Sequence, residues 1–217
     1  MLRNFDLNKY TDGCLYHQND MVKLGCKDCQ GCSFCCRDME ALVLDPYDIA
    51  ELKKGLSMDF ENLLEHGIIL RLIDGLLLPV MDTQAKNKAC AFLNEEGRCS
   101  IHSFRPGICR LFPLARYYHD DTFSYILQSQ ECRKHPSEKI KIRHWLGIPS
   151  LKAYERFVLI WHDFLKEIKE SLPQVEESQE RILHLYLLKT FYQEDYLDFY
   201  QEVERKIAQS YSILGLR

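Results

Sequence analysis

Five cysteines lie within eleven residues of this 217-residue chain: Cys26, Cys29, Cys32, Cys35 and Cys36. A C-x2-C spacing lets two thiolates converge on one ion, as in a zinc knuckle. The adjacent thiolates of Cys35 and Cys36 should converge poorly on a single tetrahedral ion. They more naturally serve two metals, or neighbouring atoms of one cluster. The run therefore indicates a metal site built from thiolates.

The spacing of this run fits two registers. The first is C-x2-C-x2-C-x3-C, the pattern of bacterial iron–sulfur ferredoxins, with Arg37 in place of the usual proline. Its thiols belong to Cys26, Cys29, Cys32 and Cys36. The second is C-x2-C-x2-C-C, formed by Cys29, Cys32, Cys35 and Cys36. Thiolates suit zinc and iron–sulfur clusters and fit magnesium or calcium badly. Two alternatives, buried hydrophobic cysteines and a catalytic disulfide, explain the crowded spacing less well.

Four more cysteines follow at wider spacing: Cys90, Cys99, Cys109 and Cys132. Glu96-Gly97 lies between the first two, and a tight turn there would bring Cys90 and Cys99 together. His102 stands three positions after Cys99. It is a candidate nitrogen ligand, with a hydrogen-bond donor behind the ligands or a packed ring as the alternatives.

Two arginines, Arg105 and Arg110, flank Cys109. A cluster of thiolates is negatively charged, and nearby guanidinium groups would offset that charge. They could also hold a carboxylate in a bidentate pair. The alternative is an ordinary salt bridge with Asp or Glu at a helix end.

The order of these motifs resembles the YkgJ-like cysteine-cluster family, a zinc- or iron-chelating domain with a CxxCxxCC signature. The matching blocks are Cys29-x2-Cys32-x2-Cys35-Cys36, Cys90, Cys99-Ser-Ile-His-Ser-Phe-Arg105-Pro106-x2-Cys109-Arg110-Leu-Phe-Pro and Cys132. The resemblance spans about residues 26–135. Ser33 stands where the family usually has glycine. Cys14 and Cys26 lie outside the pattern, so we expect Cys14 to be unliganded and Cys26 to be a reserve ligand.

The resemblance implies eight thiolate ligands: Cys29, Cys32, Cys35, Cys36, Cys90, Cys99, Cys109 and Cys132. Eight thiolates exceed one mononuclear site, so they allow two four-thiolate ions, or one four-thiolate cluster plus one ion. One relative with a similar module, the flagellin lysine N-methylase, methylates protein lysines with S-adenosylmethionine. If the chain is an enzyme, the resemblance implies a metal-dependent protein-modifying enzyme such as a lysine N-methyltransferase. The carboxylate that Arg105 and Arg110 could hold would then be that of the substrate or of S-adenosylmethionine.

Two hypotheses of function follow. The first is an iron–sulfur protein that carries electrons or modifies a protein or peptide, and a visible chromophore would mark it. The second is a zinc-stabilised protein-interaction module without catalysis, in which the metal stabilises the fold and the protein is colourless. Thiolate ligands alone do not separate the two metals.

Composition and motifs exclude several other classes. The chain is 46% hydrophobic and 28% charged, which is typical of a globular protein. Its net charge of −4 argues against nucleic-acid and acidic-membrane binding. No P-loop, G-x-G-x-x-G, G-x-S-x-G or H-E-x-x-H is present, and Met39 breaks the C-x3-C-x2-C of radical enzymes. With no signal-peptide pattern and no membrane-length apolar run, we expect a cytoplasmic protein with reduced thiols.

The first part of the chain predicts a mixture of short helices and strands. Asp45-Pro46 begins a helix that ends near Gly55, and a second helix spans Asp59–His66. Asp74-Gly75 separates two apolar runs, 68–73 and 76–80, and predicts a β-hairpin. Thr122–Gln128 is a further candidate strand. We therefore expect an α+β, helix-rich fold with a cysteine-lined metal-binding core.

The rest of the chain, which has no cysteine after Cys132, is helical by pattern. Ser150 is the expected N-cap of a helix with one apolar stripe, and Pro173 ends it. Two further helical stretches follow, one from about Val175 and one that carries Tyr196 and Phe199. We expect a metal-binding domain over 1–136 and a helical C-terminal extension over 137–217 packed on it. A protein or peptide partner would bind this extension wherever the apolar face of a helix is not packed against the rest of the chain.

Overall fold

The computed structural model describes residues 7–25, 32–39, 41–84, 88–128, 131–132 and 138–216. Their contacts divide the chain into two compact units. The first, here called the cysteine unit, comprises residues 1–40 and 83–151, and the second, the helical unit, comprises 41–82 and 152–217. Each unit is assembled from two separate stretches of chain. The predicted consecutive domains, 1–136 and 137–217, divide the chain differently and stay a prediction.

The helical unit contains a three-stranded antiparallel sheet in the order β2-β4-β3. Its strands are β2 (Leu42–Val43), β3 (Ile68–Ile73) and β4 (Leu76–Met81). The predicted hairpin is confirmed, because Asp74 and Gly75 form its turn with φ values of 51° and 85°. An added Cβ at Gly75 would lie 2.9 Å from Cδ1 of Leu172. This position therefore needs glycine for its conformation and for its close contact.

Two short helices of the same unit, α2 (Pro46–Leu56) and α3 (Phe60–Glu65), start where the sequence predicts. The carboxylate of Asp45 accepts a hydrogen bond from the Asp48 amide at 2.9 Å, and Asp48 accepts one from the Asp45 amide. Asp59 caps α3 in the same way as Asp45 caps α2. Each aspartate thus satisfies an amide that the helix itself leaves without a partner.

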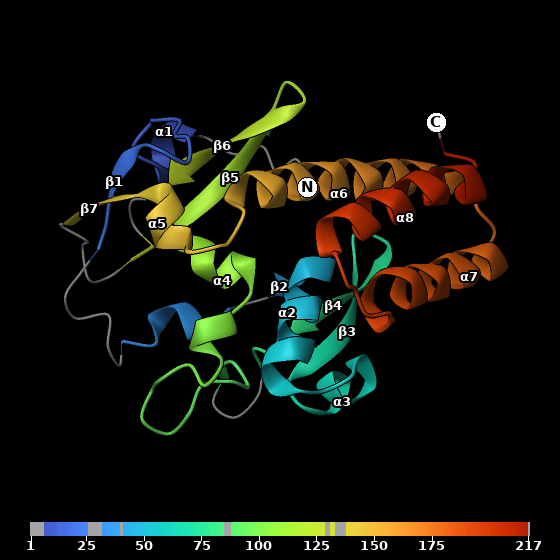
Figure 1. The fold of residues 1–217 in the computed structure, drawn as a ribbon, viewed down its shortest axis with the longest axis horizontal. Coiled ribbons are helices and arrows are strands. Elements are labelled where there is room, and N and C mark those ends of the chain that lie inside the picture. The colour runs from blue at the N-terminus through green and yellow to red at the C-terminus, as the bar shows by residue number, and fades with distance from the viewer. Residues whose placement is uncertain are drawn as a thin grey trace. The chain divides into compact units, whose positions relative to one another are not determined.

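Three longer helices complete this unit: α6 (Leu151–Ser171), α7 (Glu177–Leu187) and α8 (Phe199–Leu214). Figure 1 shows α8 alongside α6, and the two run in the same direction. Arg156 of α6 pairs with Glu204 at 2.8 Å, and Tyr211 donates to Glu167 at 3.0 Å. Buried aromatic rings fill the space between the helices: Tyr154, Phe157, Trp161, Phe164 and Phe191. The predicted helical pattern of the C-terminal region is confirmed.

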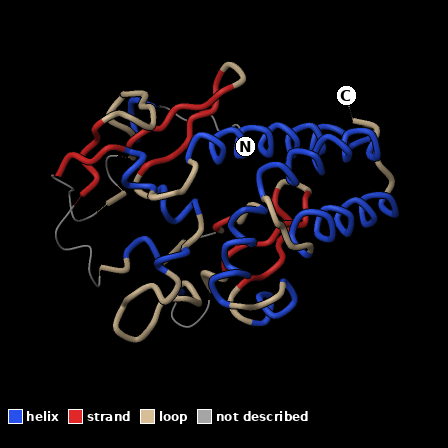
Figure 2. The backbone as a smooth tube through the Cα atoms, viewed as in Figure 1, coloured by secondary structure: helices blue, strands red, loops and turns tan. Residues whose placement is uncertain are grey.

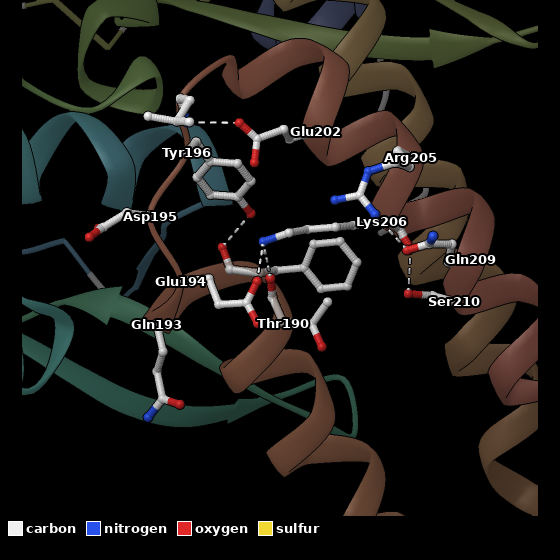
Figure 3. Close-up of polar contacts among 12 residues, drawn as sticks. Thr190, Gln193, Glu194, Asp195, Tyr196, Glu202, Arg205, Lys206, Gln209 and Ser210 are labelled. Carbon is white, nitrogen blue, oxygen red and sulfur yellow. Dashed lines mark hydrogen bonds and ion pairs between the residues drawn. The ribbon is translucent and has the colours of Figure 1, made fainter.

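Two buried lysines hold the segment between α7 and α8, where a π-helical turn spans Leu188–Gln193. Nζ of Lys206 donates to the Thr190 carbonyl at 2.8 Å and pairs with Glu194 at 2.8 Å (Figure 3). It also lies 4.3 Å from the ring centroid of Tyr196. Nζ of Lys53 donates to the Gln193 carbonyl at 2.7 Å. The carbonyls that this turn leaves unbonded are therefore satisfied by side-chain cations.

The cysteine unit is built from short elements (Figure 2). They are α1 (Leu7–Tyr10), β1 (Met21–Gly25), η1 (Phe34–Cys36), η3 (His102–Phe104), α4 (Gly107–Leu111), β5 (Leu114–His119), β6 (Thr122–Leu127), β7 (Glu138–Lys141) and α5 (Ile142–Leu146). β5 and β6 form one antiparallel hairpin, and β1 pairs antiparallel with β7. In the described part of this unit no helix exceeds five residues.

The structure corrects some sequence-based details. Gly55 lies inside α2, which ends at Ser57 in the left-handed conformation (φ 55°). Ser150 has φ 54°, so it is not the extended N-cap that the sequence suggested. Strand β5 was not expected. Asp120 and Asp121 form its turn to β6, both with positive φ. No helix in the described part of the chain combines the length and the apolar character needed to cross a membrane.

Candidate metal centre

The first group of described thiols surrounds η1, a single 3-10 turn that carries Cys35 and Cys36. Ser33 precedes it with φ 49° and ψ 10°, in the left-handed region. Its hydroxyl accepts a hydrogen bond from Nε of Arg37 at 3.1 Å. The Sγ atoms of Cys35 and Cys36 lie 3.8 Å apart. The turn therefore presents two neighbouring thiols, of which Cys35 is exposed and Cys36 is half-buried.

Backbone pairing brings Cys90 to this turn. The amide of Cys90 donates to the Cys36 carbonyl at 2.8 Å, and the amide of Asp38 donates to the Lys88 carbonyl at 3.0 Å. Arg37 and Ala89 face each other as an antiparallel bridge. This pairing is not local in sequence, so no short-range pattern predicted it. It fixes the backbone at Cys36 beside the backbone at Cys90.

Cys99 pairs with Leu93 across a hairpin-like loop that contains Glu96-Gly97, and the predicted meeting of Cys99 with Cys90 stays a prediction. Leu93 and Cys99 form an antiparallel bridge, and Gly97 has φ 71°. The amide of Asn94 donates to the Arg98 carbonyl at 2.9 Å, which closes the loop. A positive φ at Gly97 carries no steric cost, so glycine suits the turn that reverses the chain here.

Cys109 lies on α4, the short helix that begins after Pro106. The neighbouring Arg110 points its guanidinium at backbone carbonyls. Its Nε donates to the carbonyl of Arg105 at 2.9 Å, and its Nη2 donates to that of Ser103 at 2.8 Å. Its Nη1 lies 3.4 Å from the carbonyl of Leu146. Arg110 therefore ties the 103–105 turn and the end of α5 to the helix that carries Cys109.

Five thiols influence the ionisation of one another or of Arg105: Cys35, Cys36, Cys90, Cys99 and Cys109. The hydrogen bond from Cys36 lowers the pKa of Cys35 to about 7. The same bond, burial and the charges of Cys35, Cys90 and Cys99 raise the pKa of Cys36. Burial raises the pKa of Cys99, which Arg105 opposes. Neighbouring thiols cannot all ionise together without a cation between them.

Arg105 is the cation that faces this group. Burial and the charge of Arg110 lower the pKa of Arg105, whereas Cys109, Cys99 and Cys35 raise it. Its Nε is buried and has no hydrogen-bond partner among the described residues. Its Nη1 is bonded to Nε2 of His102. Burial and the charges of Arg105, Arg110 and Arg98 lower the pKa of His102, so the neutral ring accepts this bond. Nε2 of His102 is thus occupied and not free to bind a metal in this arrangement.

Three predicted ligands remain, Cys29, Cys32 and Cys132, and the structure describes the last two. Cys29, and the reserve ligand Cys26, lie outside the described residues. Cys32 and Cys132 are partly buried, the first just before η1 and the second after β6. Cys14 is exposed, and its amide is bonded to Asp12. Within the described ranges, no three His, Cys, Asp or Glu side chains are arranged to hold one metal ion. The eight-ligand assignment therefore stays a prediction.

The donor set nevertheless fits a soft metal. The five neighbouring thiols come from three stretches of chain, near residues 36, 90–99 and 109, as in metal sites that stabilise small folds. Sequence reasoning missed the importance of Ser33 and the Cys36–Cys90 pairing. Ser33 had a signal, because the related family has glycine there and the position is left-handed. The Cys36–Cys90 pairing had none.

Comparison with known proteins gives one match. A family model named CxxCxxCC, "Putative zinc- or iron-chelating domain", matches residues 28–140. The match includes all five neighbouring thiols as well as Arg105 and Arg110. No curated protein and no solved structure is detectably similar to the chain.

Proposed function

Because the chain belongs to the CxxCxxCC family of zinc- or iron-chelating domains, we propose that it holds a polynuclear metal–thiolate centre, first of all an iron–sulfur cluster. Two observations support this proposal: the backbone bond between Cys36 and Cys90, and the electrostatic influence of Cys35, Cys99 and Cys109 on Arg105. Five thiolates exceed the four positions of one tetrahedral ion. A centre with several metal atoms can use all of them. Cys35, Cys36, Cys90, Cys99 and Cys109 are the residues that would hold it.

An iron–sulfur cluster would supply one-electron chemistry, for electron transfer or for modification of a protein or peptide. The protein's own contribution would be to bring the thiols together from distant parts of the sequence and to supply the Arg105 guanidinium as a counter-charge. The proposal includes a reducing compartment such as the cytoplasm, where thiols stay available for metal.

A zinc-stabilised interaction module is the second candidate, and one distance favours it. The Sγ atoms of Cys35 and Cys36 are 3.8 Å apart. Two sulfur ligands of one tetrahedral zinc, each at about 2.3 Å from the metal, are separated by about 3.8 Å. This spacing runs against our expectation that adjacent thiolates converge poorly on one ion. In this candidate the exposed Ile182 and Leu185 of α7 would contact a protein partner.

The role of the two arginines as ligands of S-adenosylmethionine stays a prediction. Arg110 already donates to backbone carbonyls. The anionic groups that raise the pKa of Arg105 are all thiols. These contacts support a role toward the metal centre more directly than a role toward a carboxylate.

Elemental analysis of the protein purified without oxygen and without added metal tests the proposal. Iron together with acid-labile sulfide and a broad visible absorption band supports the first candidate. Colourless protein with zinc supports the second. Protein that holds neither metal, and takes up neither on reconstitution under reducing conditions, contradicts both.

A further inference from the structure

We infer that Arg105 is the internal counter-charge of the metal–thiolate centre, and that Arg110 is the residue that positions it. The inference rests on the proposed metal binding and goes beyond it. It holds that these two side chains control how tightly the metal is retained and the electronic state of the centre. Neither side chain is a metal ligand, since a guanidinium offers no lone pair.

The surroundings of Arg105 are unusual for an arginine. Its Nε is buried, and no acceptor for it exists among the described residues. It forms no ion pair with a carboxylate within the described ranges, unlike the exposed Arg156 and Arg181. The groups that raise the pKa of Arg105 are the thiols of Cys109, Cys99 and Cys35, which become anionic when they bind metal. A half-buried guanidinium whose Nε is buried without an acceptor is costly unless an anion stands beside it.

A metal–thiolate centre is such an anion. Four thiolates around a divalent metal carry a net charge of −2, which a low-dielectric interior would penalise without a nearby cation. A guanidinium that faces the sulfur atoms lowers this cost and supplies N–H groups for hydrogen bonds to sulfur. The free Nε of Arg105 is therefore suited to donate to a thiolate that binds metal.

Arg110 fixes where Arg105 lies. Its Nε and Nη2 donate to the carbonyls of Arg105 and Ser103, which immobilises the turn from which the Arg105 side chain extends. His102 holds Arg105 from the other side through its Nε2. A lysine in place of Arg110 has one ammonium instead of a planar fork, so it cannot reach both carbonyls in this geometry. Arg110 is thus a positioning residue and acts through Arg105.

The test compares variants of the full-length protein for the rate at which a chelator removes the native metal. Arg105→Gln should release metal at least about 10-fold faster than the unmodified protein, as expected for loss of a partner behind the ligands. Arg105→Lys should recover most of this loss, because the positive charge is kept. Arg110→Lys should behave like Arg105→Gln despite keeping its charge. Arg98→Gln is the matched control, since it removes the same charge from an exposed side chain next to Cys99.

A spectroscopic readout separates this role from a structural one. A cation beside sulfur stabilises the sulfur electrons, so Arg105→Gln should move the thiolate-to-metal charge-transfer band to longer wavelength. The band is recorded on the native metal, or on cobalt(II) in place of zinc. The inference would be overturned if Arg105→Gln and Arg110→Lys released metal at the rate of the unmodified protein and left its absorption band unchanged. It would also be overturned if Arg98→Gln changed the release rate as much as Arg105→Gln does. If Arg105→Gln does not fold, the inference is tested by the other two variants: Arg110→Lys should release metal faster than Arg105→Lys. Absence of metal in the unmodified protein would instead contradict the proposed function.

Discussion

The backbone of Cys90 is hydrogen-bonded to the backbone of Cys36, with the Cys90 amide 2.8 Å from the Cys36 carbonyl. This bond joins the two cysteine-bearing parts of the sequence before any metal is considered. A metal bound by their thiols would reinforce a contact that the polypeptide already makes. The thiols on either side of this contact are therefore the first to test.

Replacement of Cys36 or Cys109 by alanine should remove bound metal and destabilise the cysteine unit. Metal-binding energy is folding energy in such sites, so we expect Tm to fall by at least about 5 °C, where 1 kcal/mol corresponds to about 2–4 °C. Metal content per chain and thermal unfolding followed by circular dichroism measure the two effects. Cys14→Ala is the control, and it should change neither. Full metal content and unchanged Tm in both test variants would disprove the assignment.

Metal removal should weaken one unit more than the other. The chain has two tryptophans, Trp145 in the cysteine unit and Trp161 in the core of the helical unit. Trp161→Phe leaves Trp145 as the only tryptophan whose fluorescence reports unfolding, and Trp145→Phe leaves Trp161. On chelation, we expect the unfolding midpoint seen by Trp145 to fall and the midpoint seen by Trp161 to change much less. Equal shifts of both signals would show that the metal supports the two units alike.

Lys206 should contribute substantially to the stability of the helical unit. It is buried and donates to the Thr190 carbonyl and to Glu194, so Lys206→Met keeps the apolar stem but leaves both of these half-buried or exposed acceptors without this donor (Figure 3). We expect the free energy of unfolding in urea to fall by about 2 kcal/mol. Arg205→Met is the matched control on the same helix, because Arg205 is exposed and bonded only to Gln209 among the described residues. Its effect should stay within about 0.5 kcal/mol.

Glu202 should make the start of α8 sensitive to acid. Its carboxylate accepts from the amides of Asp198 and Leu197 at 2.8 and 2.7 Å, and these bonds lower the pKa of Glu202 below the ordinary value of 4.5. Because the folded-state pKa is depressed, this stabilisation is complete above pH 4.5 and is lost as the pH falls through the folded-state pKa.

The measurement is urea unfolding of the unmodified protein and Glu202→Gln between pH 7 and pH 3. At pH 7 the variant should be the less stable of the two. Below pH 4.5 the difference should shrink, because the unmodified carboxyl also becomes neutral. Glu96→Gln, a change in an exposed loop of the cysteine unit, should match the unmodified protein throughout. A difference that stays constant with pH would contradict the assigned role.

Local chemistry explains which parts of the fold the sequence predicted. The Asp74-Gly75 hairpin, the caps at Asp45 and Asp59, and the end of α6 before Pro173 all depend on residues adjacent in sequence. The β1–β7 pairing and the Cys36–Cys90 contact depend on segments far apart, and no periodicity encodes them.

The candidate site shows the same division. The thiols were found from their types and spacing, whereas the roles of the arginines required the fold. Arg105 and Arg110 look equivalent in sequence. In the structure Arg110 donates to backbone carbonyls, whereas Arg105 is bonded to His102 and has a buried Nε without a partner among the described residues.

The interleaved units have a consequence for synthesis of the protein on the ribosome. Residues 41–82 emerge early, but the helices that complete their unit start at residue 152. At about 5–20 residues per second, the apolar hairpin Ile68–Met81 waits roughly 7–27 seconds for these helices to be translated. During that interval its strands are open to association with other chains. The hairpin is therefore a segment that chaperones would protect while translation is under way.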